Sequence, residues 1–192
     1  FILDTSANYI IQNDKNMVSQ GQYFNPLTSL YLFPRGEDFS DVAVYERYDD
    51  LSGVNTQYWP YGDLGGVSSQ NPYWIMNRMN RENDRRRYKL AASLQYNIIE
   101  GLNVQGRVSI DNTESKYTEK FHAGTVGNFA GPKGRYKEEN RLDRQVYADV
   151  LANFNKTFNE FNVTANLGAS IKDLRMELTS LHGDLNNVTN HF

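Results

Sequence analysis

Residues 88–110 read YKLAASLQYNIIEGLNVQGRVSI, and this stretch decides the fold. From Tyr88 to Ile98 every second residue is apolar, whereas the residues between them are mostly polar. Such alternation is typical of a β-strand with one apolar and one polar face. A turn signal at residues 100–101 follows, and a second alternating run covers residues 102–111. The stretch therefore predicts a β-hairpin with two long strands.

The same pattern returns near the end of the chain. Alternating runs cover residues 146–158 and 161–171, and Asn159 and Glu160 between them give a second turn signal. A polar, glycine-containing stretch, residues 119–140, separates the two predicted hairpins. Short turns and long loops therefore alternate along the chain. Bacterial outer-membrane β-barrels show this asymmetry, with tight periplasmic turns and longer extracellular loops.

Strand length and hydropathy favour a membrane β-barrel. A strand of about eleven residues, tilted by about 45°, spans roughly 25 Å, which matches the apolar band of outer-membrane barrels. Strands in soluble proteins usually have about five or six residues. Hydrophobic residues make up 39% of the chain and mean hydropathy is −0.67, so the sequence predicts no membrane-spanning helix. We predict an all-β fold that is part of an antiparallel transmembrane β-barrel.

The presence or absence of this alternation divides the whole chain into predicted strands and loops. Residues 12–84 lack periodicity and contain several prolines. An unstructured loop of this length is unusual in a compact domain, so we expect a folded extracellular region with a short helix near residues 39–47. The predicted division is a strand at 1–11, an extracellular loop region at 12–84, a hairpin at 85–118, an extracellular loop at 119–140, a hairpin at 141–175 and a loop at 176–192.

Composition argues against several classes of site. The 20 basic and 23 acidic residues are well mixed, so no basic nucleic-acid-binding surface is expected. The chain has no Cys, which excludes disulfides and thiolate metal sites. His122, His182 and His191 lack the spacing of metal ligands. No pair of carboxylates stands out as an acid and a base. We therefore predict no catalytic residue, no metal and no cofactor.

Several segments resemble one protein family over nearly the whole chain and in consistent order. They are GQYFNPLTSLYLFPRGEDF (21–39), QYWPYGD (57–63), NPYWIMNR (71–78), GLNVQGRVSID (101–111), YADVLANFNKTF (147–158) and HGDLNNV (182–188). These segments are similar to the SusC/RagA group of TonB-dependent outer-membrane transporters from Bacteroidetes.

The resemblance implies an arc of a 22-stranded barrel in the cell outer membrane, in contact with its lipid, that imports oligosaccharides or peptides. In this family a SusD-like surface lipoprotein closes the barrel from outside, and the TonB complex supplies energy from within. Because the chain starts at Phe1 within a predicted strand, we expect an internal fragment. The plug domain, the TonB-contacting segment and the closing strands of the barrel are then expected outside it.

Five aromatic residues in the loop region are candidates for contact with the cargo or with the lipoprotein lid. They are Tyr58, Trp59, Tyr61, Tyr73 and Trp74. Aromatic faces stack on sugar rings and also anchor protein interfaces. The alternative is that these rings form a small core that holds the loop together. An ordered loop must bury apolar surface to offset its lost conformational entropy.

Four arginines precede the first alternating run. They are Arg81, Arg85, Arg86 and Arg87. If the turn at residues 100–101 is periplasmic, these arginines face outward, and guanidinium groups bind phosphate bidentately. Contact with lipopolysaccharide phosphates is therefore one hypothesis. The alternative is local ion pairing with Glu82 and Asp84, or simple solvation.

Three functions remain open from the sequence. A nutrient transporter needs apolar rows that face lipid and polar rows that line a lumen. A soluble carbohydrate-binding β-sandwich needs the same apolar rows to form its core, and strand length favours the transporter over it. An outer-membrane adhesin or receptor would use the same barrel without transport. A secreted glycan-cleaving enzyme lacks a convincing carboxylate pair.

Overall fold

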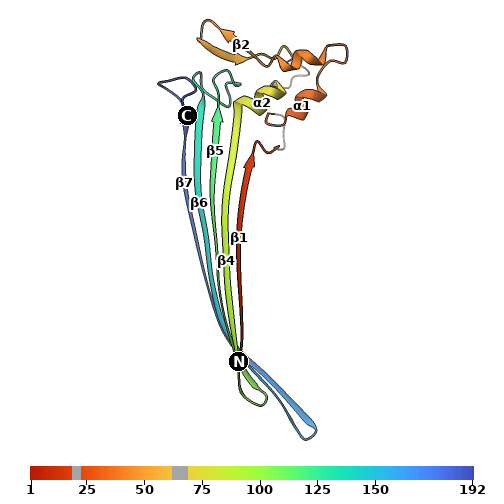
Figure 1. Ribbon diagram of the computed structural model, residues 1–192, viewed down its shortest axis with the longest axis vertical. Helices are drawn as coiled ribbons and strands as arrows, with labels where there is room; N and C mark the ends of the chain where they lie inside the picture. Colours follow the sequence, from red (N-terminus) through yellow and green to blue (C-terminus); the bar gives the residue numbers. More distant parts are fainter. Residues whose placement is uncertain (19–22, 62–68) are drawn as a thin grey trace. The chain divides into compact units, whose positions relative to one another are not determined.

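The computed structural model describes residues 1–18, 23–61 and 69–192 (Figure 1). Residues 19–22 and 62–68, which fall in the predicted loop region 12–84, lie outside the described residues. Five long strands follow one another in the main sheet in the order β1 (Ile2–Lys15), β4 (Met79–Ile99), β5 (Leu102–Phe121), β6 (Arg135–Phe158) and β7 (Phe161–Asp184). The described part is mostly antiparallel sheet, with 62% strand and 10% helix, so the prediction of an all-β fold is confirmed.

Both predicted hairpins are present, and their tight turns lie where the sequence placed them. Residues 100–101 connect β4 to β5, and residues 159–160 connect β6 to β7. Gly101 has a φ of +84°, and a side chain at this position would collide with the carbonyl oxygen of Asn155. The Gly101 carbonyl accepts a hydrogen bond from the Asn155 amide at 2.7 Å. Glycine is therefore required both by the turn and by the close approach of β6.

The strands are longer than the sequence predicted. β4 begins at Met79 and not at residue 85, and β7 ends at Asp184 and not at residue 175. The predicted loop at 176–192 is therefore mostly strand. The start of β4 carries charged and polar side chains at eight successive positions, residues 80–87. A strand segment with two polar faces shows no period of two, so alternation could not mark where β4 begins.

The chain forms two compact units, each made of several segments. The first unit comprises Phe1–Gln12, Arg85–Ser115 and Asn140–Thr179, all from the long strands. The second comprises Asn13–Asp84, Lys116–Glu139 and Ser180–Phe192. It contains the strand ends and α1 (Pro26–Tyr31), a 3₁₀ helix η1 (Phe39–Ala43), the antiparallel pair β2 (Glu46–Asp49) and β3 (Val54–Gln57), and α2 (Pro72–Arg78). No described helix is both long enough and apolar enough to cross a membrane.

The second unit has its own hydrophobic core. Buried Trp74, Ile75, Met79, Phe121 and Ala130 form this core, and Phe24, Tyr45 and Phe129 pack against it. The described residues of the region that lacked periodicity therefore contribute to a folded unit, as expected, and η1 lies within the range where a short helix was predicted.

Asparagines and prolines start both α-helices of the second unit. The Asn25 and Asn71 side chains accept hydrogen bonds from the first-turn amides of α1 and α2, and proline follows each of them. Proline is well suited to the first helical position, where its missing N–H has no partner in any helix. The buried Asn71 amide also donates to the Val42 and Tyr58 carbonyls, at 2.9 and 3.2 Å. One side chain thus connects α2 to two preceding segments.

Candidate functional site

Polar side chains connect neighbouring strands on one face of the first unit. The contacts are Arg87 with Asp111 at 2.8 and 2.5 Å, Arg107 with Asp149 at 3.0 Å, and Asn153 with Asn103 at 2.9 Å. All six residues have odd numbers in β4, β5 and β6, as the alternation predicted for the polar rows. Each arginine binds both oxygens of its carboxylate, a geometry that fixes the two side chains relative to each other. We name this surface the polar face.

The polar face contains a hollow of about 460 Å³. The side chains of the polar rows that line it are Asp4, Ser6, Lys89, Ala91, Ser93, Arg107, Ser109 and Tyr147. The hollow forms because Ala91, Ser93 and Ser109 are short, while Lys89 and Tyr147 are long. Hydroxyl, ammonium, guanidinium and carboxylate groups surround it, so it can hydrogen-bond a polar solute.

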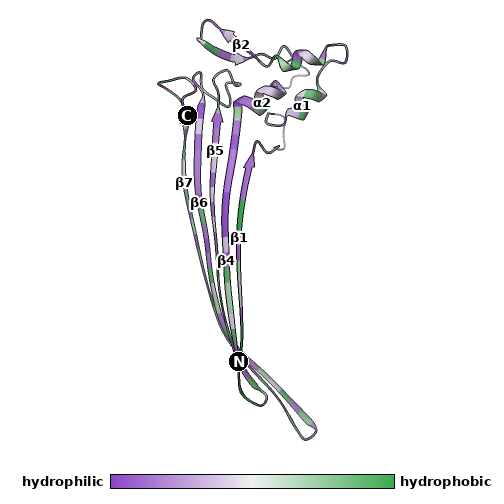
Figure 2. Ribbon diagram, viewed as in Figure 1, coloured by the Kyte–Doolittle hydropathy of each residue, from purple (hydrophilic) through white to green (hydrophobic). Residues whose placement is uncertain are grey.

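The opposite face of the same strands is apolar and exposed. Leu90, Leu94 and Ile98 of β4 are 47%, 50% and 48% exposed, and no core residue of the described part lies in this row. The row continues on β7 with exposed Leu167 and Ile171. Figure 2 shows hydrophobic and hydrophilic residues alternating along these strands. We name this surface the apolar face.

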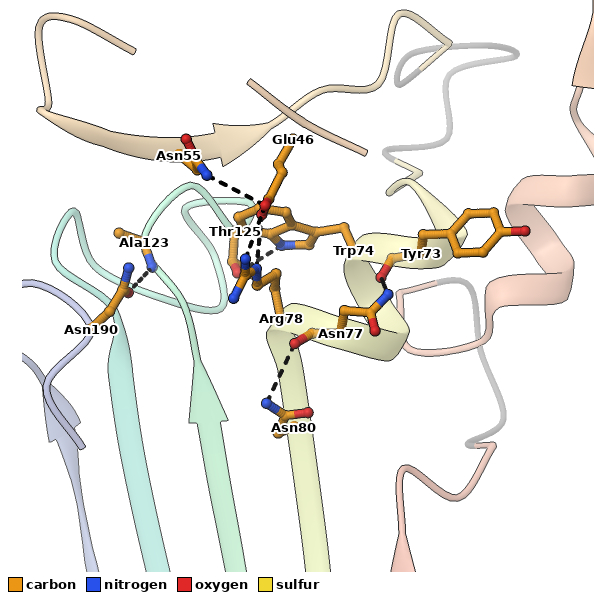
Figure 3. A network of polar contacts seen from close by, with 10 residues as sticks. All are labelled: Glu46, Asn55, Tyr73, Trp74, Asn77, Arg78, Asn80, Ala123, Thr125 and Asn190. Atoms are coloured by element: carbon orange, nitrogen blue, oxygen red, sulfur yellow. Dashed lines mark hydrogen bonds and ion pairs between the residues drawn. The ribbon is translucent and has the colours of Figure 1, made fainter. Parts of the chain in front are cut away.

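Of the five aromatic candidates, Trp74 is fully buried. Its indole N–H donates a hydrogen bond to the Thr125 hydroxyl at 3.0 Å (Figure 3). Trp74 belongs to the core of the second unit, where it packs with Ile75, Met79 and Phe121. Trp74 therefore has the role that the sequence analysis gave as the alternative, which is packing in a small core.

The other four aromatic candidates keep some exposure, and each of them contacts another residue of the second unit. The Arg47 guanidinium lies 3.4 Å from the centre of the Tyr58 ring. Trp59 donates to the Ser69 hydroxyl at 2.9 Å and packs edge-on against Tyr61, with 5.2 Å between ring centres. Tyr73 stacks on Tyr45 at 6.4 Å. Each of these four rings thus has a packing partner within the second unit.

The structure does not gather the four arginine candidates at one site. Arg87 pairs with Asp111 on the polar face, and Arg85, two residues earlier in the same strand, belongs to that face too. Arg86 alone of these three lies in the same row as the apolar face. In the second unit, the Arg81 guanidinium donates to the Met17 carbonyl at 3.0 Å. Alternation along β4 thus separates arginines that are adjacent in the sequence.

An ion pair in the second unit was missed by the sequence analysis. Arg78, the last residue of α2, binds both carboxylate oxygens of Glu46, at 2.8 and 2.9 Å (Figure 3). The Asn55 side chain donates to the same carboxylate at 3.3 Å. Hydrogen bonds from Arg78 hold the pKa of Glu46 below its usual range. The two partners are 32 residues apart and follow no pattern, so only the folded chain reveals the pair.

This ion pair predicts a pH dependence for the β2–β3 hairpin. Because the folded pKa of Glu46 lies below its ordinary value of 4.5, the pair stabilises the hairpin above that pH. The stabilisation is lost as the pH falls through the lower, folded value. We expect hydrogen-exchange protection factors of β2 and β3 to fall roughly fivefold, equivalent to about 1 kcal/mol.

Glu46→Gln is the matched control for this prediction. Asp49 in the same hairpin also has a lowered pKa, because the Ser52 side chain and neighbouring amides hydrogen-bond it. The variant should therefore retain the Asp49 contribution and lose the rest of the pH dependence. An identical acid response in the wild type and in Glu46→Gln would contradict the role of this pair.

No group of three or more potential metal ligands is found in the ranges that the structure describes. No protein-family model matches the chain, and no match is found among curated proteins. The similarity to SusC/RagA transporters therefore stays a prediction that rests on the segments quoted above.

Proposed function

We propose that the chain forms part of the barrel wall of an outer-membrane active transporter of the SusC/RagA type. The transporter would import oligosaccharides or peptides, with a SusD-like lipoprotein as its lid and the TonB complex as its energy source. The observation that carries the proposal is the contrast between the two faces of the first unit. Half-exposed leucines and isoleucines occupy one face, and bidentate ion pairs and amides occupy the other. A location in the barrel wall would suit both faces, with lipid against the apolar face and water against the polar face.

The connections between the strands support this assignment and suggest an orientation. In an antiparallel sheet, successive connections alternate between the two ends. The turns after β4 and β6 have two residues each, whereas residues 16–78 and 122–134 connect the other strands. By the asymmetry of outer-membrane barrels, the two long connections would be extracellular. They would then be the first part of the chain to meet a lid or a cargo.

Strand length disfavours the soluble β-sandwich, because β4 has 21 residues and β7 has 24, whereas strands in soluble proteins usually have about five or six. In a sandwich, the inner faces of two sheets cover each other, and the apolar row becomes the core. Leu90, Leu94 and Ile98, which are about half-exposed in this chain, would then have to pack against a second sheet. The adhesin alternative uses the same wall, and no observation favours it over transport.

Single-cysteine labelling tests which face contacts lipid. The chain has no natural Cys, so one cysteine can be placed at Leu94 or at its neighbour Gln95 in a cysteine-free version of the full-length protein. We expect a fluorophore on Leu94→Cys to be quenched by brominated lipids in reconstituted vesicles. We expect Gln95→Cys to react with a membrane-impermeant maleimide and to resist lipid quenching. The reverse pattern, or equal quenching at both positions, would contradict the proposal.

A further inference from the structure

A second pocket lies within the second unit. Its volume is about 360 Å³, at the small end of the roughly 300–1,000 Å³ typical of ligand sites. The residues that line it are Tyr48, Val54, Asn55, Trp74, Arg78, His122 and Asn190. They come from β2, β3, α2 and the segments that follow β5 and β7. A space of this size suits one ring-sized chemical unit.

The charge of the pocket is balanced before any ligand enters. Arg78 is the one residue of this lining that carries a permanent charge, and Glu46 neutralises it through two hydrogen bonds. An anionic ligand would have to compete with the Glu46 carboxylate, and a cationic ligand would meet the Arg78 guanidinium. The lining therefore favours an uncharged ligand.

The remaining polar groups both donate and accept hydrogen bonds. His122 is half-buried, and burial, followed by the nearby Arg78, lowers the pKa of its imidazole, so the ring is neutral at pH 7. A neutral imidazole has one donor and one acceptor nitrogen. The amide of Asn190 accepts from the Ala123 N–H at 2.7 Å, which leaves its NH₂ group to donate (Figure 3). Hydroxyl groups, which also donate and accept, complement such a lining.

The walls of the pocket are fixed, and its rim is aromatic. Trp74 is held by its hydrogen bond to Thr125, and the Asn190 backbone N–H donates to the Lys133 carbonyl at 2.9 Å. Tyr48, at the rim, is 65% exposed, so its ring is available to stack on one face of a ligand. A pre-organised lining loses little entropy when a ligand binds.

We propose that this pocket binds a single uncharged, hydroxyl-rich ring, that is, one monosaccharide unit of a neutral carbohydrate. The inference deepens the proposed function, on which it rests for its biological role, by narrowing the cargo to neutral glycans. The pocket would hold one sugar unit at the part of the chain proposed to be extracellular.

Ligand-detected NMR on the full-length protein in detergent tests the proposal. The probes are glucose, galactose, mannose and xylose as neutral sugars, glucuronate as a carboxylated sugar, and alanyl-alanine as a peptide. We expect saturation transfer to at least one neutral sugar and much weaker transfer to glucuronate and to the dipeptide. Asn55→Trp, which fills the pocket, should reduce the affinity at least tenfold, whereas Ser52→Trp in the exposed turn of the same hairpin should leave it unchanged.

A second variant is needed because Asn55→Trp could abolish binding simply by misfolding the hairpin. Tyr48→Ala removes a mostly exposed ring and should weaken sugar binding about threefold to tenfold. Binding that survives both Asn55→Trp and Tyr48→Ala, a preference for glucuronate or for the dipeptide, or no binding of any probe would overturn the proposal. If the lipid-quenching test failed but the protein still bound a neutral sugar, the transporter proposal would be contradicted and the proposal of a sugar-binding pocket would stand.

Discussion

Replacing Leu94 with arginine is expected to destabilise the protein in a lipid bilayer by about 2–4 kcal/mol, the cost of a cation near the bilayer midplane on the outside of a barrel. Leu94 lies in the middle of the apolar row that extends from Leu90 to Ile98, and half of its side chain is exposed. An arginine there would have to leave water for hydrocarbon without a partner.

Gln95→Arg is the matched control, because it adds the same side chain one residue along the same strand, in the polar row. That row already contains Arg87 and Lys89, so we expect a change below about 1 kcal/mol. Reversible urea unfolding of the full-length protein in vesicles measures both variants. Equal losses, or a larger loss for Gln95→Arg, would reverse the assignment of the two faces. A wild-type protein that folds as a monomer in buffer without detergent would contradict a membrane location altogether.

The central parts of the strands were predictable because their two faces differ chemically. In β4 and β5 a period of two appears wherever one row is apolar and the other polar, and there the predicted strands match the structure. β7 shows where this signal fails. Up to Ile171 its apolar residues have odd numbers, and Leu174, Met176 and Leu178 then have even numbers within the same continuous strand. The apolar row changes face near Lys172, so a single period could not follow β7 to its end at Asp184.

The second unit could not be predicted in detail, because its contacts join residues far apart in the sequence. Trp74 reaches Thr125 across 51 positions, and Arg78 reaches Glu46 across 32. Neither pair belongs to a spacing that a helix or strand imposes. Local signals did exist at the helix starts, where Asn71 precedes a proline. Such signals fix where an element begins and leave its partners undetermined.

The contacts on the polar face were predictable only in part. The alternation assigned Arg107 and Asp149 to polar rows, but their pairing depends on the register between β5 and β6. That register is set by a connection of thirteen or so residues and not by a two-residue turn, so no hairpin rule gives it. The sequence thus predicted which side chains share a face and not which of them touch.

Replacing Trp74 with alanine is expected to destabilise the second unit by about 3–5 kcal/mol, the range measured for removal of a large buried aromatic side chain. Trp74 is fully buried among Ile75, Met79 and Phe121, so its loss would leave a cavity in the core. It would also leave the Thr125 hydroxyl without the indole N–H that now donates to it. Trp74→Phe keeps part of the volume and removes this hydrogen bond, so we expect a smaller loss, of about 1–3 kcal/mol.

Tyr73→Ala, at the neighbouring and more exposed position, is the control for the truncation and should cost less than about 1 kcal/mol. Hydrogen exchange of α2 and of residues 122–134 in the full-length protein measures the three variants under one condition. The expected order of protection is wild type, Tyr73→Ala, Trp74→Phe and Trp74→Ala, from highest to lowest. If Tyr73→Ala lowered the protection of these segments as much as Trp74→Ala, the partly exposed Tyr73 ring would be as important for the stability of the unit as the buried Trp74 ring. A ring that the unit needs for its own packing would not be available to bind a cargo or a lid. The same measurement therefore decides whether Tyr73 stays a candidate contact.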